Sequence, residues 1–559
     1  MPPGSSAASP RSPDTSVDPE RLLGTAIRLG ADECEVARAA RRVTTIRITD
    51  SAVSEAKQVS DDQYGIRLVA RGRIASASVP AGSGRISETV GRMMHASGSI
   101  QRPCRFWRGL AEPVSRGRPG ELRGTYDARL DRMTCREAED LAERMIVAAS
   151  NKKVGAITGS LHVVCETFEV SNTRGLHDVE TSTYVAGLVN AESALRVRGA
   201  SASGAAAQQQ QQSQQQQPPL PYPTVSGIGY GSARTLDGFD PERAGADACE
   251  MCISSENPAS VDGGTYTVIF EPYSVGELLA FVVAPNFELK RVLDGRSCFS
   301  GSTGRPVASE LLTIRDDPHA PDAIGSHRID AEGVPTAGRP LVKRGVFEGT
   351  YSDLFDYYRA VYDNDGDDSG GDDDNGSDAN HGGASGDAAS DNHDAGNGPP
   401  AGASDSDCAA RGTLGKGRVL AAAGPGNAAR MAVPMGRGAD PIPVSAPHNM
   451  SVSSDVEQIP PDEMVQDVKK GLLVGRLWYT YAVNPISGDF SCTARSGVFL
   501  IRDGQIVSPT RPVRIMHSLP ALLRDVSGIG NDARSVVQWA SLSSVAPSLR
   551  VENVPVIRI

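Results

Sequence analysis

Two compositionally biased tracts cut this 559-residue chain into segments that can fold, and they constrain its architecture more than any motif. Residues 201–223 hold a run of glutamines followed by Pro218 and Pro219, and residues 363–407 consist largely of Gly, Asp, Asn and Ser without Lys or Arg. Such tracts bury too little apolar surface to offset the entropy of ordering them. We therefore predict two disordered inserts, together with a disordered tail over residues 1–17.

The remaining sequence is long enough for several cores and predicts an α+β protein. We expect an N-terminal α+β domain over 18–98 and a central α+β domain over 120–252, which contains the first insert. A mostly β C-terminal domain over 263–559 contains the second insert. The expected class is therefore mixed α/β domains followed by a β-rich domain.

Local signals place several elements. Asp18-Pro19-Glu20 predicts a helix start, and Thr134-Cys135-Arg136-Glu137 is a capping box that begins a second helix. Ala70-Arg71-Gly72-Arg73 predicts a hairpin, as does Asp503-Gly504. Ser274-Val275-Gly276-Glu277 has the pattern of another capping box, before an apolar helix that runs to about Val283.

Bulk properties exclude several classes of protein. The net charge of −12 argues against binding nucleic acid by neutralising phosphates. No apolar run is long enough to span a membrane, and the polar N-terminus is not a secretory signal. Nine cysteines spread over the chain do not resemble a disulfide framework. We expect a cytoplasmic protein.

The residues alone predict no active site. None of the nine histidines is followed by another at helical zinc-ligand spacing. Cys249 and Cys252 form a single CxxC without a second pair, and Cys298 has no histidine nearby in sequence to activate it. Asp363, Asp365 and Asp367 alternate as in a calcium loop but lack its glycine and closing glutamate.

A set of ordered phrases resembles the TldD/PmbA metalloprotease family. The phrases are YTVIFEPYSVGELL at 266–279, LDGRS at 293–297, SELLTIRDDP at 309–318, DAEGVPT at 330–336, NPISGDFS at 484–491 and GND at 530–532, with ADE at 31–33 and GIRLV at 65–69 in the first domain. Within this family, which has also been described as modulators of DNA gyrase, the chain is similar to the PmbA (TldE) type.

The resemblance implies where a zinc site would lie. TldD-type members carry HExxxH on the helix after the first strand of the C-terminal domain, with a later cysteine. In register, Ala280 and Phe281 replace the first His and the Glu, and Pro285 replaces the second His. The cysteine position falls near Arg495, and Cys492 lies three residues earlier.

We therefore expect the non-catalytic subunit of a zinc metallopeptidase complex, acting in proteolysis of peptides or unfolded proteins. The chain itself would bind no cofactor, and zinc would reside on a TldD-type HExxxH partner. Contacts to the peptide chamber or partner are expected around Asn484, Pro485, Gly488 and Asp489.

Two alternatives stay open at this point. The chain could be a metallopeptidase with atypical ligands drawn from His319, His327 or His517. It could also be a binding or scaffold protein without enzymatic activity.

Overall fold

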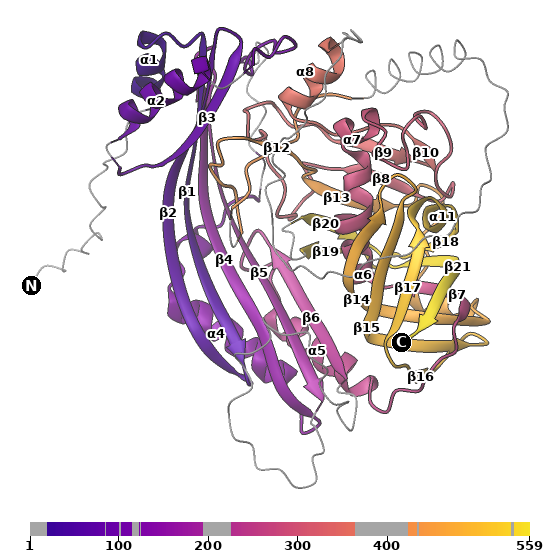
Figure 1. Ribbon diagram of the computed structural model, residues 1–559. Helices are drawn as coiled ribbons and strands as arrows, with labels where there is room; N and C mark the ends of the chain where they lie inside the picture. The colour runs from indigo at the N-terminus through magenta and orange to yellow at the C-terminus, as the bar shows by residue number, and fades with distance from the viewer. Residues whose placement is uncertain are drawn as a thin grey trace, which may run out of the picture.

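The computed structural model describes residues 19–83, 85–99, 102–113, 122, 124–193, 225–363, 423–432, 435–537 and 542–559. The predicted tail and nearly all of the two predicted inserts lie outside these residues. Two lobes face each other: a tall curved sheet formed by the N-terminal half of the chain, and a C-terminal lobe with two large sheets and a two-stranded one (Figure 1).

One six-stranded antiparallel sheet forms the N-terminal lobe, in the order β3-β2-β1-β4-β5-β6. Its strands are β1 (Glu33–Thr49), β2 (Ala52–Ala70), β3 (Arg73–Pro80), β4 (Val154–Asn172), β5 (His177–Ser193) and β6 (Ser226–Ala233). Because β1 pairs with both β2 and β4, the sheet runs without a break across the boundary predicted between residues 98 and 120. The domain limits themselves remain predictions.

Helices cover this sheet in two groups. They are α1 (Pro19–Arg28), α2 (Ile86–Ser99), α3 (Ala128–Arg132), α4 (Cys135–Ala149) and α5 (Pro241–Ser254). The predicted capping box at the start of α4 is confirmed, because Thr134 and Glu137 bond reciprocally to each other's backbone N–H groups. Leu22 and Ala26 of α1 pack against Ile66 and Leu68 of β2 in one core, whereas α4 and α5 build a second core.

The C-terminal lobe contains a sheet that closes on itself. Strands β14, β7, β21, β17 and β15 follow one another, and β15 pairs back to β14. The strands of this sheet are β7 (Gly264–Phe270), β14 (Lys470–Asn484), β15 (Asp489–Arg502), β16 (Gln505–Pro509), β17 (Val513–Ser518), β18 (Val526–Ile529) and β21 (Leu549–Arg558). Closure removes most unpaired edges and surrounds the largest apolar core of the described chain.

A second sheet of this lobe has the order β10-β9-β8-β13-β20-β19, and β11 pairs with β12 beside it. These strands are β8 (Thr313–Asp316), β9 (Arg339–Lys343), β10 (Val346–Phe347), β11 (Ala428–Ala429), β12 (Val444–Ser445), β13 (Asn449–Ser453), β19 (Arg534–Val537) and β20 (Ser543–Ala546). The helices of the lobe are α6 (Pro272–Leu278), η1 (Leu279–Val283), η2 (Ala284–Phe287), α7 (Leu289–Leu293), α8 (Leu354–Tyr362), α10 (Pro461–Gln466) and α11 (Leu519–Arg524).

These elements confirm the α+β class and the β-rich C-terminal part. Both predicted hairpin turns are also confirmed, with Asp503 and Gly504 at positive φ as a tight turn of this kind requires. No described helix combines the length and the apolar character needed to cross a membrane.

The predicted capping box at Ser274 is wrong. Helix α6 begins at Pro272, with Glu271 at the N-cap position three residues before Ser274, and it has no side-chain cap. Glu277 does not reach back along the helix. It is buried and accepts a hydrogen bond from the Leu477 backbone N–H, because β14 lies beside α6. The Glu277 carboxylate, which the sequence pattern assigned to the N-terminus of the helix, therefore makes a tertiary contact instead.

Candidate functional site

The segment after β7 is where the family resemblance places the metal motif, and its backbone is irregular. Helix α6 ends at Leu278 and continues as a π-helical turn, η1, and then as a 3-10 turn, η2. Pro285 sits inside this continuation and has no N–H to donate to a regular helix. π-Helical turns are frequent at functional sites. The segment has this irregular backbone although its side chains are apolar.

The three residues in the metal-motif register offer no ligand atoms. Ala280, Phe281 and Pro285 have hydrocarbon side chains, and Phe281 packs against the main C-terminal core. Ala280 and Pro285 form part of the wall of a cavity of about 270 Å³. These residues therefore do not fit a zinc ion, which requires nitrogen, sulfur or oxygen ligands.

Two histidines, His327 and His448, reach the same cavity from other elements. Their ring centroids lie 6.4 Å apart. The His327 imidazole lies 3.5 Å from the Glu180 carboxylate, yet burial lowers its pKa to about 4 and thus favours the neutral ring. His448 Nε2 donates to the Gly426 carbonyl at 2.9 Å, so this nitrogen is already engaged.

The other candidate histidines lie elsewhere. His319 Nε2 is 3.0 Å from the Thr336 hydroxyl, and the His517 ring is tilted against Phe490, with ring centroids 6.3 Å apart. Across the described residues, no three His, Cys, Asp or Glu side chains converge in a geometry that could hold a metal ion. The set His319, His327 and His517 is thus not brought together by the fold.

Near the position of the family cysteine, Cys492 points inward. It is 1% exposed within the C-terminal core, and burial raises the pKa of its thiol well above the usual value. Arg495 lies over the Trp478 ring, with 5.1 Å from its guanidinium carbon to the ring centroid. Cys492 is therefore a core residue.

The other candidate cysteines are also in surroundings that favour the protonated thiol over the thiolate. Burial raises the pKa of Cys252 to about 11 and that of Cys298 to about 12. Cys249 precedes Cys252 by one turn of α5, and burial raises its pKa as well. Environments that raise a thiol pKa oppose nucleophilic reactivity, because the thiolate is the reactive form.

The loop predicted to contact the chamber or partner joins β14 to β15. Asn484 Oδ1 accepts a hydrogen bond from the Ile486 N–H, and the Ser487 hydroxyl donates to Asp489 at 2.6 Å. Gly488 has φ = 76°, and its carbonyl accepts from the Leu519 N–H. These residues therefore shape the turn, as their types suggest.

Exposed apolar side chains extend from this turn along the neighbouring strands. We call Tyr481, Val483, Ile486 and Met516 the hairpin patch. Ile486 is 64% exposed and Val483 is 54% exposed. Ser491 on β15 stands directly between Tyr481 on β14 and Met516 on β17, so the patch spans three strands of one face. Arg514 donates to both Ser491 and the Tyr481 hydroxyl, so the patch combines exposed apolar side chains with an arginine, a composition found at protein interfaces.

A buried ionic network joins the two lobes, and sequence reasoning did not single it out. Arg67 of β2 lies 3.0 Å from Glu35 and 2.7 Å from Glu332. Arg430 lies 2.5 Å from Glu35, and every one of these four side chains is at most 5% exposed. Arg67 lies in the phrase GIRLV and Glu332 in the phrase DAEGVPT. A charged residue among apolar neighbours was the sequence signal that could have indicated a buried ion pair.

The comparison with known families addresses the C-terminal lobe directly. The model of the PmbA/TldA metallopeptidase C-terminal domain matches residues 263–367 and 418–558. Residues 263–367 and 418–558 are therefore similar to the C-terminal domain of the TldD/PmbA metallopeptidase family. The match begins one residue before β7 and includes α6, η1 and η2, so the irregular segment described above lies inside the family domain.

Two curated relatives are similar over short segments. The chain is 31% identical over 118 residues to a metalloprotease of Methanothermobacter thermautotrophicus, which is 21% of this chain and 26% of the relative. It is 30% identical over 107 residues to a metalloprotease TldD homolog of Haemophilus influenzae, which is 19% of this chain and 22% of the relative. The aligned segments thus span about a quarter of each relative's length.

Solved structures resemble the whole fold. TldE from Thermococcus kodakarensis superposes with a TM-score of 0.70 at 18% identity, covering 96% of this chain and 99% of that one. A proposed modulator of a DNA gyrase from Thermotoga maritima superposes with a TM-score of 0.69, also at 18% identity, with the same coverage of both chains. The two-lobed arrangement is therefore a known TldE-like fold.

Proposed function

We propose that this chain is the non-catalytic, PmbA/TldE-type subunit of a zinc metallopeptidase complex acting on peptides or unfolded proteins. One observation carries the proposal. The family domain is present with its irregular η1–η2 segment, but Ala280, Phe281 and Pro285 occupy the register of HExxxH. Metal-assisted peptide hydrolysis needs ligands and a base there, and hydrocarbon side chains supply neither.

The hairpin patch supports a role in assembly. It adjoins the turn that contains Asn484, Pro485, Gly488 and Asp489, and four apolar side chains gather on it. Burying such side chains against a partner contributes about 25 cal/mol for each Å² of apolar surface removed from water. In the proposed complex the TldD-type HExxxH subunit covers this patch and holds the zinc.

The test is co-expression with the HExxxH relative from the same cell, followed by co-purification and metal analysis of each separated chain. We expect a stable complex, zinc on the relative, and peptidase activity only when both chains are present. The purified chain alone should hold well under one zinc per molecule and should not cleave casein.

A pair of variants locates the interface. Ile486→Asp places a charge in the hairpin patch and should reduce co-purification at least tenfold, since a buried unpaired carboxylate is unfavourable. Val507→Asp is the matched control: it introduces the same charge at a residue of β16 that is 50% exposed, and it should associate normally. Equal association of both variants would remove the hairpin patch from the proposal, and stoichiometric zinc on this chain alone would refute its non-catalytic role.

A further inference from the structure

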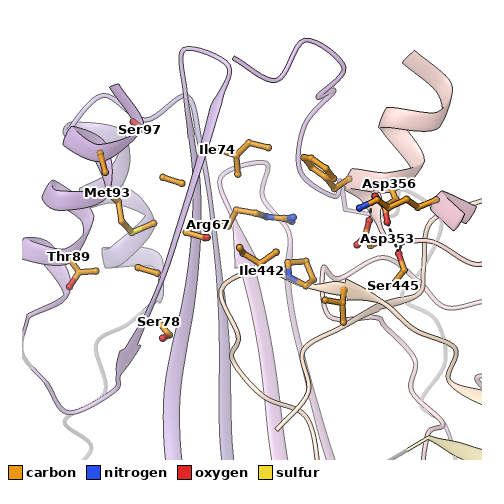
Figure 2. Close-up of a pocket in the computed structure, with 18 of the residues that line it drawn as sticks. Arg67, Ile74, Ser78, Thr89, Met93, Ser97, Asp353, Asp356, Ile442 and Ser445 are labelled. Carbon is orange, nitrogen blue, oxygen red and sulfur yellow. Dashed lines mark hydrogen bonds between the residues drawn. The ribbon is translucent and has the colours of Figure 1, made fainter. Parts of the chain in front are cut away.

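Strand β2 has two halves with different surroundings. Its C-terminal half, 63–70, pairs with β1 on one side and with β3 on the other. Figure 2 shows this half at Arg67, with Ile74 and Ser78 of β3 beside it and α2 packed against β3. The N-terminal half, 52–62, pairs with β1 alone, and no strand of the described chain lies on its other side (Figure 1). This half is therefore an open edge of the N-terminal sheet.

The backbone of this open edge presents hydrogen-bonding groups to solvent. The Asp62 carbonyl accepts the Ala81 N–H on the side away from β1. Alternate residues of an antiparallel strand direct both backbone groups to the same side, so Ser60, Gln58 and Ala56 direct theirs outward as well. Seven consecutive side chains of this half are exposed, so both faces of the strand contact solvent. An edge of this kind is a template for a further strand.

The charged residues of the open edge distinguish between the ways in which a second copy could pair with it. Two copies can pair antiparallel about a two-fold axis, so that each contributes the same segment. With the axis at Ala56, Glu55 of each copy lies opposite Lys57 of the other. An axis at Glu55 or at Lys57 places like charges opposite each other, which is destabilising. An axis at Gln58 places Glu55 opposite Asp61.

The length of the open edge favours the same axis. The β1–β2 turn contains Asp50 and Ser51, both at positive φ, and it closes one end of the edge. The hydrogen bond between Ala81 and Asp62 closes the other end. With the axis at position 56, the turn of one copy lies near Ser60 of the other, just short of Ala81. An axis farther toward position 62 would bring the second copy onto Ala81.

We propose that the open edge of β2 binds the same edge of a second copy of this chain, antiparallel and centred on Ala56. The two N-terminal sheets then join into one sheet across the two-fold axis. Because β2 has one extra residue relative to β1 at Ser54, the regular pairing is short, and we expect a reversible dimer rather than a permanent one. The hairpin patch lies on the other lobe, so this dimer goes beyond the proposed complex and does not depend on it.

Sedimentation equilibrium of the purified full chain over a range of concentrations tests the dimer. We expect a monomer–dimer equilibrium in the micromolar range. Hydrogen exchange of the same chain supplies a second measurement that needs no substitution. The Ala56 amide should exchange more slowly as the concentration rises, because its N–H becomes bonded to the second copy.

Two charge reversals test the position of the axis. Lys57→Glu places carboxylates opposite each other, and Glu55→Lys places ammonium groups opposite each other. Each variant alone should associate at least tenfold more weakly than the parent. An equimolar mixture of the two should recover association, because the acidic edge of one variant then faces the basic edge of the other. Mixing would not repair a defect in folding.

Lys343→Glu is the matched control, the same change at an exposed residue of β9 in the C-terminal lobe, and it should associate as the parent does. The proposal is wrong if the parent stays monomeric throughout the micromolar range, or if either single reversal retains the dimer. A mixture of the two reversals that stays monomeric would also overturn it. A dimer that is lost in Ile486→Asp but kept in Lys57→Glu would lie at the hairpin patch instead.

Discussion

The interface between the lobes and the interior of the C-terminal lobe both contain buried apolar clusters, but the interface also buries a network of charges. Arg67, Glu35, Glu332 and Arg430 meet at the interface as fully buried charges, each with a defined partner. The C-terminal interior contains mainly hydrocarbon side chains, including those of η1, where the family resemblance places a metal motif. Buried charge pairs thus add to apolar contacts, such as those of Phe168 and Ile329, where the lobes meet, whereas apolar contacts dominate inside the C-terminal lobe.

The largest effect is expected from Arg67→Met, which would leave Glu332 and one side of Glu35 without their cation. Removing one partner from a buried ion pair destabilises a protein by about 3–5 kcal/mol. Urea unfolding measures this loss. The control is Arg38→Met, because Arg38 is 24% exposed and pairs with Asp62. It should lose only about 1 kcal/mol, as is usual for pairs near the surface. Equal losses would mean that the interface does not depend on its buried charges.

A steric test of the C-terminal interior is Gly488→Ala. A Cβ at Gly488 would lie 2.8 Å from Pro520 and 3.0 Å from Cys298, in a backbone with φ = 76°. We expect a loss of about 2 kcal/mol from strain and overlap together. Gly295→Ala is the matched control, with φ = 70° and no heavy atom within 4 Å of the new Cβ. It should lose about 1 kcal/mol from the backbone alone. Thermal denaturation of both variants measures these losses of stability. If Gly295→Ala loses as much stability as Gly488→Ala, the whole effect comes from the positive φ.

A pH-dependent effect is expected from Glu271, a carboxyl group at the interface that forms no ion pair. Glu271 lies in a cavity of about 310 Å³ between α5 and the C-terminal lobe, with Asp247 and Arg534 among its neighbours. Burial, with added repulsion from Asp532 and Asp247 and partial relief from Arg534, raises its pKa from 4.5 to about 7. The folded chain therefore holds this proton more tightly than the unfolded chain does, so its stabilising contribution is lost as pH rises from about 4.5 to about 7.

Glu271→Gln should remove this dependence. The variant and the parent should be equally stable near pH 4, and the variant should be more stable by about 3 kcal/mol at pH 8. Unfolding curves at the two pH values measure the difference. If the variant is less stable at pH 8, then the ionised Glu271 is stabilised by Arg534 and the interface has no unpaired carboxyl there.

Much of the local structure could be predicted because it depends on short-range chemistry. The capping box of α4 needs only Thr134 and Glu137, and the β15–β16 turn needs only Asp503 and Gly504. The capping box predicted at Ser274 is wrong because Glu277 accepts a hydrogen bond from the Leu477 N–H, two hundred residues away. A local sequence pattern cannot predict such a contact.

The sequence by itself determined the α+β class and the hydrocarbon character of Ala280, Phe281 and Pro285, because side-chain chemistry needs no fold to be known. Only the tertiary structure decided that Cys492 is buried in a core, that His327 and His448 share a cavity, and that Arg67 meets Glu332 across the lobes. These contacts depend on which strands pair although they are far apart in the sequence. The pairing in the closed sheet and in the six-stranded sheet brings the residues together.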